Sequence, residues 1–238
     1  MKIWIHGVTG YMGQELEKAI QKSKKYHFLG GSSSADSLPN VKNMILNADV
    51  VIDFSSKQGN DALWEYRDFL PDIVICTTGL ESHQLSRWSQ SHQKVLFAPN
   101  TSLGVFITNL LAKKAAKILS DDYDIEILET HHKRKKDAPS GTALHLAQSI
   151  ASATLENHQV VCHRESPRKP REIGVSTLRG GGVFGEHEVR FLGEHDEIVI
   201  SHKAYSRALF AQGALKLADW IFKQHEVKLY NLEDVSFS

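Results

Sequence analysis

The first hundred residues alternate short apolar runs with amphipathic segments. Apolar runs at residues 3–5, 27–29, 50–54, 73–76 and 95–98 predict strands. Segments 13–23, 61–69 and 82–91 carry apolar residues at helical spacing and predict helices between those strands. This rhythm is typical of a parallel sheet covered on both faces by helices, in which ligands bind beyond the carboxyl ends of the strands.

Beyond residue 103 the pattern changes to a mixture of helices and longer strands. A helix is expected at 105–119, a strand at 123–130, a second helix after Pro139, and strands near 175–178, 188–192 and 197–204. A last strong helix is expected at 208–222. The chain therefore predicts an α/β part followed by an α+β part, without repeats or low-complexity linkers.

Composition and charge narrow the class of protein. The 238 residues hold 28 Lys plus Arg and 28 Asp plus Glu, so the chain as a whole is no electrostatic binder of nucleic acid or anionic membrane. Two cysteines, Cys76 and Cys162, are too few for a disulfide framework and fit a reducing compartment. The first apolar run is too short for a signal peptide, and no apolar stretch approaches a bilayer crossing. We expect a soluble, cytoplasmic protein.

Three glycines follow the first predicted strand. Gly7, Gly10 and Gly13 depart from the usual G-x-G-x-x-G spacing, because the first glycine lies one place further back. They nevertheless sit between a strand and a helix, where the backbone can approach a pyrophosphate at the helix N-terminus. The alternative is a tight turn with glycines only for backbone geometry, and Met12 in it is more often a core residue than a cofactor contact.

The chemistry concentrates in residues 129–142. His131 and His132 lie at the tip of a predicted strand, and Ser140-Gly141-Thr142 opens a helix whose free N–H groups favour an anion such as a carboxylate. The two imidazoles are adjacent on an extended segment, so they diverge, and we expect no metal. The basic run 133–136 alone would indicate a solvated loop or a nucleic-acid patch, but a pocket for phosphate or a dicarboxylate explains it better.

The run HHKRKKDAPSGTA at 131–143 resembles the signature of the dihydrodipicolinate reductase family, a His-His-x-x-Lys-x-Asp-Ala-Pro-Ser-Gly-Thr-Ala motif. The glycine turn, Cys76-Thr77-Thr78-Gly79, the segment 98–105, Arg179-Gly180-Gly181 and Gly185-Glu186-His187 are similar to further landmarks of the family, in the family's order. The loops between them are shorter than is usual, notably after Ser34.

The resemblance implies a fold and an activity. The fold is a Rossmann-like dinucleotide-binding domain at 1–102, a smaller α+β substrate-binding and tetramerisation domain at 103–207, and a return of 208–238 to the first domain. The activity is the reduction of 4-hydroxy-tetrahydrodipicolinate (dihydrodipicolinate) to tetrahydrodipicolinate, with NADH or NADPH, in lysine and diaminopimelate biosynthesis. Members of the family are commonly homotetramers.

The resemblance also implies residue roles. His131 and Lys135 are expected to be catalytic, as acid/base and as proton donor or charge stabiliser. Only Lys135 of the basic run aligns with the family lysine, so Lys133, Arg134 and Lys136 are left to solvent or cofactor charge. The expected substrate-binding residues are His132, Ser140, Gly141, Thr142 and Arg207, although Arg207 alternatively is a structural cap. The expected cofactor-binding residues are Gly7, Val8, Thr9, Gly10, Tyr11, Met12, Ser34, Cys76, Thr77, Thr78, Ala98, Pro99, Asn100 and Thr101.

The segment after the second predicted strand departs from the family. An acidic and then a basic residue are often found near Ser34 and Ala35, whereas here three serines are followed by Asp36. A carboxylate at this place favours NADH and an arginine favours NADPH, so we expect use of both cofactors. A solvated turn without any cofactor contact is the alternative.

Two other classes of function remain open from the sequence. One is a different nicotinamide enzyme on the same scaffold, such as an aspartate-type dehydrogenase. The other is a nucleotide-binding regulator that has lost catalysis, although His131, Lys135 and Ser140-Gly141-Thr142 are all present.

Overall fold

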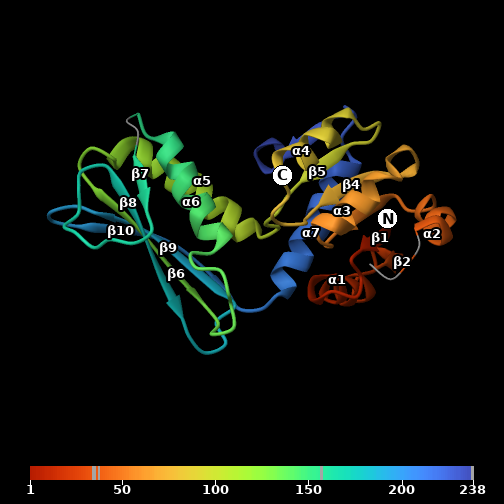
Figure 1. Cartoon of the computed structure of the whole chain (residues 1–238), viewed down its shortest axis with the longest axis horizontal. Coiled ribbons are helices and arrows are strands. Elements are labelled where there is room, and N and C mark those ends of the chain that lie inside the picture. Colours follow the sequence, from red (N-terminus) through yellow and green to blue (C-terminus); the bar gives the residue numbers. More distant parts are fainter. Residues whose placement is uncertain (34–35, 37, 156–157, 237–238) are drawn as a thin grey trace. The chain divides into compact units, whose positions relative to one another are not determined.

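The structure, a computed structural model, describes residues 1–33, 36, 38–155 and 158–236. The chain folds as two compact units (Figure 1). The first unit consists of Met1–Ser102 with Arg207–Ser238, and the second of Leu103–Ser206.

The first unit is built on a parallel sheet of six strands. The strand order is β11-β5-β4-β3-β1-β2, and all neighbouring pairs run parallel. The strands are β1 (Lys2–His6), β2 (His27–Ser32), β3 (Val50–Asp53), β4 (Asp72–Ile75), β5 (Val95–Phe97) and β11 (Leu229–Asn231). The parallel α/β sheet predicted from the alternating pattern is thereby confirmed.

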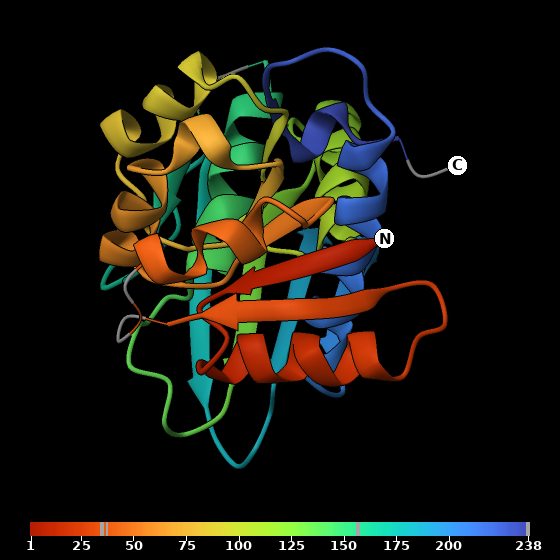
Figure 2. The ribbon, with the colours of Figure 1, turned by 90° about the vertical axis from the view of Figure 1, so that its right-hand side faces the viewer.

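Helices cover both faces of this sheet. They are α1 (Tyr11–Gln21), α2 (Leu38–Ile45), α3 (Lys57–Trp64), α4 (Ser82–Arg87) and α7 (Ala208–Phe222). Ile3 and Ile5 of β1 point to a core shared with α1 and α7, whereas Trp4 points to a second core shared with α3 and the segment after α4. Figure 2 shows α1 running alongside β1 and β2. Because both faces of the strands are buried, their sequences read as continuous apolar runs.

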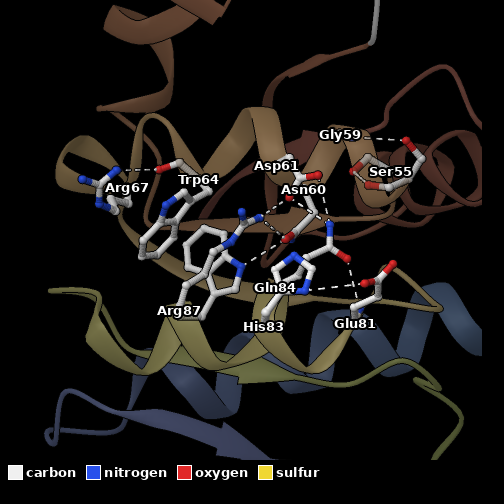
Figure 3. Close-up of polar contacts among 12 residues, drawn as sticks. Ser55, Gly59, Asn60, Asp61, Trp64, Arg67, Glu81, His83, Gln84 and Arg87 are labelled. Atoms are coloured by element: carbon white, nitrogen blue, oxygen red, sulfur yellow. Dashed lines mark hydrogen bonds and ion pairs between the residues drawn. The ribbon is translucent and has the colours of Figure 1, made fainter.

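A polar network joins α3 to α4 (Figure 3). Gln84 and Arg87 donate to the Asp61 carboxylate, with Arg87 at 2.7 Å. The buried Asn60 side chain accepts from Trp88 Nε1 at 3.1 Å and donates to the Asp53 carboxylate at 2.9 Å. Asp53 is fully buried at the end of β3, so this network fixes the loop after that strand.

The second unit is a mixed sheet of five strands in the order β10-β9-β6-β8-β7. Its strands are β6 (Asp124–His131), β7 (Gln159–Val161), β8 (Glu172–Arg179), β9 (Gly185–Leu192) and β10 (Glu197–Ala204). In Figure 1, α5 (Leu103–Leu119) and α6 (Gly141–Ala153) lie against one side of this sheet. Apolar residues of both helices form the core with alternate residues of the strands, such as Ile125 and Ile127.

Several elements differ from their predicted bounds. The helix predicted at 61–69 begins at Lys57, after the Ser56 side chain accepts from Gly59 N, and continues as a separate 3-10 turn at Arg67–Phe69. Helix α2 and the three-residue strands β7 and β11 were not expected, because so few residues display no period. None of the helices in the described part of the chain has the length and apolar character that a bilayer crossing requires.

Candidate active site

The register of three neighbouring strands gathers polar side chains at one end of the second unit's sheet. Glu129 of β6 lies opposite Thr177 of β8 and His187 of β9. Two residues on, His131 lies opposite Arg179. Directly paired residues of adjacent strands share a face, and Glu129 and His131 continue the side of β6 that Ile125 and Ile127 present to the helices. The site therefore extends the core of this unit.

Glu129 is the centre of this cluster. Its side chain is fully buried, and its Oε1 accepts from Ser140 N at 3.1 Å, Thr177 Oγ1 at 3.2 Å and Arg179 NH2 at 2.7 Å. Its other oxygen, Oε2, is in hydrogen-bond contact with His131 Nδ1. Burial alone raises a carboxyl pKa, but Arg179, His131 and the Ser140 N–H outweigh it and lower the pKa of Glu129. Glu129 is therefore an ionised carboxylate inside the fold.

Arg179 connects this carboxylate to the signature loop, residues 132–139 between β6 and the N-cap of α6. The same NH2 nitrogen that donates to Glu129 also donates to the carbonyl oxygen of Asp137, at 2.7 Å. The loop is further held by Gly180 N, which donates to His131 O at 2.9 Å. The end of β8 thus positions both the histidine and the loop that follows it.

His131 combines burial with an ion-pair partner. Its side chain is 11% exposed, and burial lowers the pKa of the imidazole although Glu129 pulls it upward. The His187 ring meets the His131 ring edge-on, with centroids 5.2 Å apart. A neutral imidazole with one nitrogen bound to a carboxylate is a group that can take up and release a proton near neutral pH.

His187 is more deeply placed. Its Nε2 lies 3.3 Å from Ser140 Oγ, while its Nδ1 is buried and has no hydrogen-bond partner among the residues that the structure describes. Burial, together with the neighbouring His131, lowers the pKa of His187 to about 4. His187 therefore stays neutral over the physiological range.

Ser140 begins helix α6. Its Oγ accepts from Ala143 N at 3.2 Å and its O accepts from Leu144 N at 3.0 Å, which makes it the N-cap. Its own N–H donates to Glu129, and the residue is only 2% exposed. Ser140 therefore holds the start of the helix rather than lying open to solvent. Gly141 is exposed and Thr142 half-buried in the first turn, whose N–H groups an α-helix leaves to outside acceptors.

Lys135 differs from the rest of the basic run. Lys133, Arg134 and Lys136 are exposed, whereas Lys135 is half-buried, and its Nζ lies 2.8 Å from Asp137 Oδ2. Its backbone N–H donates to His132 O at 3.1 Å. His132 is also half-buried, and its buried Nδ1 has no hydrogen-bond partner within the described part of the chain. The structure thus sets Lys135 apart from its basic neighbours and brings it into the same short loop as His132.

The second unit contains a group of three side chains that could hold a metal ion. It differs from the pair His131 and His132, for which the sequence predicts no shared metal. Glu129, His131 and His187 offer ligand atoms within 4.8 Å of one another. The Glu129 carboxylate, however, is already paired with the Arg179 guanidinium. A second cation beside that arginine would be repelled, so the donor set does not fit a resident metal.

The glycine turn of the first unit forms a tight cradle. Gly7 has φ +87°, and a Cβ there would lie 2.7 Å from Phe54 O, so only glycine fits. A Cβ on Gly13 would lie 2.7 Å from Val8 Cα. Gly10 is the N-cap residue of α1, and the turn is held by Gly7 N and Val8 N, which both donate to Ser32 O. The residues present therefore fit a dinucleotide, whose pyrophosphate needs such a close backbone approach.

The other predicted cofactor residues follow strands β4 and β5 of the same sheet. Cys76, Thr77, Ala98 and Thr101 are buried, whereas Thr78 and Pro99 are exposed and Asn100 is half-buried. Within the turn, Thr9, Gly10 and Tyr11 are exposed, and Val8 and Met12 pack on the core. The turn and both loops lie at carboxyl ends of parallel strands, where a nucleotide binds in such sheets.

The segment after β2 is described only in part. Ser34 lies outside the described residues. Asp36 turns back, and its Oδ2 accepts from both Ser33 N and Ser33 Oγ at 2.8 Å. Arg207 belongs to the first unit, where its guanidinium lies 5.5 Å from the centre of the Tyr11 ring.

Sequence reasoning missed Glu129, Thr177 and the chemical part played by Arg179 and His187. The signal that the sequence offered was the alternation of side chains between the two faces of a strand. Glu129 lies two residues before His131 on a strand and so shares its face. The strand pairings that bring Thr177, Arg179 and His187 alongside are not encoded locally.

Comparisons with known proteins agree over the whole chain. The family description "Dihydrodipicolinate reductase, N-terminus" matches residues 1–101, and "Dihydrodipicolinate reductase, C-terminus" matches residues 104–235. The 4-hydroxy-tetrahydrodipicolinate reductase of Campylobacter jejuni is 41% identical over 242 residues, covering 98% of each chain. That of Rickettsia rickettsii is 39% identical, covering 99% of this chain and 98% of the relative.

A solved structure shows the same fold. The dipicolinate-bound dihydrodipicolinate reductase of Paenisporosarcina sp. TG-14 superposes with a TM-score of 0.80 at 24% identity, covering 99% of both chains. Family matches along both units, together with relatives near 40% identity, go beyond fold. The signature, the glycine cradle and these matches together show that the chain belongs to the dihydrodipicolinate reductase family.

Proposed function

We propose that this protein reduces 4-hydroxy-tetrahydrodipicolinate to tetrahydrodipicolinate with NADH or NADPH, a step of diaminopimelate and lysine biosynthesis. The balanced reaction consumes one reduced cofactor and one proton, and releases the oxidised cofactor and water. The observation that carries the proposal is the buried Glu129–His131 pair beside Lys135 and the α6 start, in a chain related along its whole length to reductases of that name.

The first unit supplies the cofactor site in this proposal. The backbone of the Gly7–Met12 turn receives the pyrophosphate, and the loops Cys76–Thr78 and Ala98–Thr101 flank the nicotinamide. The cofactor, when bound, supplies the hydride. Asp36 and Ser33 lie where the adenosine ribose is recognised in such folds, and Ser34 remains a proposed contact of the same kind.

The second unit supplies the substrate site. A cyclic dicarboxylate needs an anion site for its acid groups, and we assign this to His132, Gly141, Thr142 and the first turn of α6, with Ser140 as the cap that shapes it. Arg207 is kept as a proposed substrate contact. The dipicolinate carried by the related Paenisporosarcina enzyme is the planar dicarboxylate that such a site would accept.

Proton transfer falls to His131 and Lys135. His131 is neutral at physiological pH because burial lowers its pKa, so it can accept a proton and return it. Lys135 carries a positive charge that stabilises the negative charge developing on the ring as the hydride arrives. Groups of this kind contribute about 10²–10⁴-fold each.

The oligomeric state and compartment complete the proposal. Leu178, Leu192 and Val199 lie more than a third exposed on strands β8, β9 and β10. Their strand neighbours Thr177, Phe191 and Ile200 face the helices, so these three lie on the opposite face of the sheet. We assign this face to a homotetramer contact, which sedimentation analysis would test. The free thiols Cys76 and Cys162 suit the reducing cytoplasm.

A spectrophotometric assay at the nicotinamide absorption band tests the proposal. Enzymatically generated 4-hydroxy-tetrahydrodipicolinate is mixed with the protein and each reduced cofactor in turn, and we expect substrate-dependent cofactor oxidation. The same protein should not reduce NAD⁺ or NADP⁺ with aspartate or other amino acids. Turnover of an amino acid without turnover of the cyclic substrate would overturn the proposal in favour of an amino-acid dehydrogenase.

A further inference from the structure

The two oxygens of the Glu129 carboxylate have different partners. Oε1 accepts from Ser140 N at 3.1 Å, Thr177 Oγ1 at 3.2 Å and Arg179 NH2 at 2.7 Å. Oε2 contacts His131 Nδ1. These contacts come from four places in the sequence: β6 itself, the N-cap of α6 and two positions on β8. The orientation of the carboxylate is therefore fixed by the fold.

This geometry determines which nitrogen of His131 carries the proton. An ionised carboxylate only accepts hydrogen bonds, so the hydrogen between Oε2 and Nδ1 belongs to the imidazole. A neutral imidazole has one N–H, and placing it on Nδ1 leaves the lone pair on Nε2. Gly185 lies beside this second nitrogen, since a Cβ on Gly185 would be only 3.1 Å from Nε2. The glycine leaves room at the atom that must meet a reacting group.

We infer that Glu129 is a positioning residue that fixes His131 as its Nδ1–H tautomer and thereby makes Nε2 the atom that exchanges a proton with the substrate. Arg179 balances the buried carboxylate, and the Ser140 and Thr177 bonds prevent it from turning. The inference rests on the proposed function for the identity of the substrate, but the tautomer it assigns to His131 does not.

Glu129 also affects the charged form of His131. When Nε2 takes up a proton, the imidazolium gains a carboxylate at Nδ1, which stabilises it. Burial acts in the opposite direction, as do Lys135 and Arg179, while His187 packs against the ring as a neutral neighbour. Removing the Glu129 charge leaves only the groups that oppose protonation, so the pKa of His131 must fall further.

Glu129→Gln provides a sharp test because of the three donors at Oε1. The amide oxygen of the glutamine must take the Oε1 position to satisfy them, which places the NH2 group where Oε2 was, facing His131 Nδ1. An NH2 group only donates, so Nδ1 must become the acceptor and the proton must move to Nε2. The substitution thus exchanges the tautomer while hardly changing the shape of the side chain.

The primary measurement is the pair of ¹⁵N chemical shifts of the His131 ring, assigned by the loss of its signals in His131→Gln. In the wild-type protein above the His131 pKa, we expect a protonated Nδ1 and an unprotonated Nε2. In Glu129→Gln we expect the two nitrogens to exchange roles. An aspartate that orients a histidine in this way in serine hydrolases contributes about 10⁴-fold through the tautomer, so kcat should fall at least about 100-fold with little change in dipicolinate affinity.

Glu126→Gln is the matched control. Glu126 lies on the same strand but on the other face, and it also pairs with arginines, at 2.8 Å from Arg164 and 3.0 Å from Arg168. This variant loses a carboxylate that is likewise paired with arginine, although it is 21% exposed, and it leaves the His131 contact intact. It should keep both the wild-type tautomer and the wild-type kcat.

A wild-type His131 that carries its proton on Nε2 would overturn the inference, even if Glu129→Gln failed to fold. So would a Glu129→Gln protein with the exchanged tautomer and full kcat, because Nε2 would then have no part in the proton transfer. If the wild-type protein shows the Nδ1–H tautomer but no turnover of the cyclic substrate, the proposed function fails while the positioning of His131 by Glu129 stands.

Discussion

Lys135 and Asp137 form an ion pair within the signature loop, with Nζ 2.8 Å from Oδ2, and the lysine lowers the pKa of that carboxyl against the effect of burial. The lysine that matches the family signature is therefore oriented before any substrate arrives. Its neighbours Lys133 and Lys136, in contrast, are exposed.

Lys135→Met is expected to lower kcat by about 10²-fold or more, because it removes the charge that stabilises the developing anion. Fold and cofactor affinity should remain, since a half-buried loop side chain contributes little to the core. Steady-state kinetics and a thermal melt measure both. Lys133→Met is the control and should change little. Equal losses in the two variants would mean that the basic run acts through its summed positive charge and not through Lys135 alone.

Pyridine-2,6-dicarboxylate is expected to inhibit competitively with the substrate, and Thr142→Val should weaken that inhibition. A hydrogen bond to a charged group is worth about 1.5–3 kcal/mol, or roughly ten- to a hundredfold in affinity. Inhibition constants of the two proteins give the answer. An unchanged constant in Thr142→Val would move the dicarboxylate away from the start of α6.

NADH and NADPH are expected to support similar catalytic efficiencies, within about tenfold or about 1.4 kcal/mol. The Asp36 carboxylate is engaged by Ser33 at two positions, each 2.8 Å away, so it is partly satisfied within its own turn. It is therefore less available to bond the ribose hydroxyls, which is how a carboxylate at this place favours NADH. Measured kcat/KM values for both cofactors test this, and a preference beyond roughly a hundredfold in either direction contradicts it.

The stability of the protein should fall in mildly acidic solution because of His187. Burial lowers its pKa from 6.5 to about 4 in the folded chain, so the unfolded chain binds the proton more tightly. The free energy of unfolding must therefore decrease as the pH falls from about 6.5 to about 4, by up to about 3 kcal/mol from this residue. Urea unfolding of wild type and His187→Gln across this range should show a shallower pH dependence in the variant.

His195→Gln is the control for this effect, because it also removes one histidine, at a side chain that is 94% exposed and lies outside the buried cluster. This variant should keep the wild-type pH dependence. A variant at His187 with the full wild-type pH dependence would show that the proton is taken up elsewhere.

Gly13→Ala is expected to abolish tight cofactor binding. The added Cβ would lie 2.7 Å from Val8 Cα and collide with the backbone of the turn, which must then move out of its cradle. Calorimetric titration with NADH and NADPH measures the loss. Gly182→Ala serves as control, since no atom of the described residues lies within 4 Å of a Cβ there. Undiminished affinity in Gly13→Ala would place the pyrophosphate away from this turn.

The sequence predicted the layers of the fold well, because buried parallel strands such as 50–54 read as unbroken apolar runs. It could not show α2 or the short strand β11, which depend on tertiary packing rather than on a period of their own. Within the candidate site, the signature placed His131, Lys135 and Ser140 in one segment. The roles of Arg179 and His187 depend on strand pairing across dozens of residues, which no local pattern contains.

Ser140 shows how a buried neighbour changes the use of a predicted ligand-binding group. The sequence predicts that Ser140 helps to hold a bound carboxylate, and in the structure its N–H donates to Glu129 while its Oγ accepts from Ala143 N. The hydroxyl can still donate one hydrogen bond. The backbone N–H of a serine at a helix start can bind either a ligand or a protein group. Here the buried carboxylate of Glu129, two residues before His131, takes that N–H.

The return of α7 to the first unit determines the order in which the protein can fold during synthesis. Ala211, Ala214 and Ala218 of this helix are completely buried in the core beneath β1 and β3. The ribosome has therefore made all of residues 103–206 before the first unit receives the helix that closes its core. The second unit, with its histidine cluster, can fold while the first still exposes apolar strands. The N-terminal part of the nascent chain must therefore be protected from aggregation.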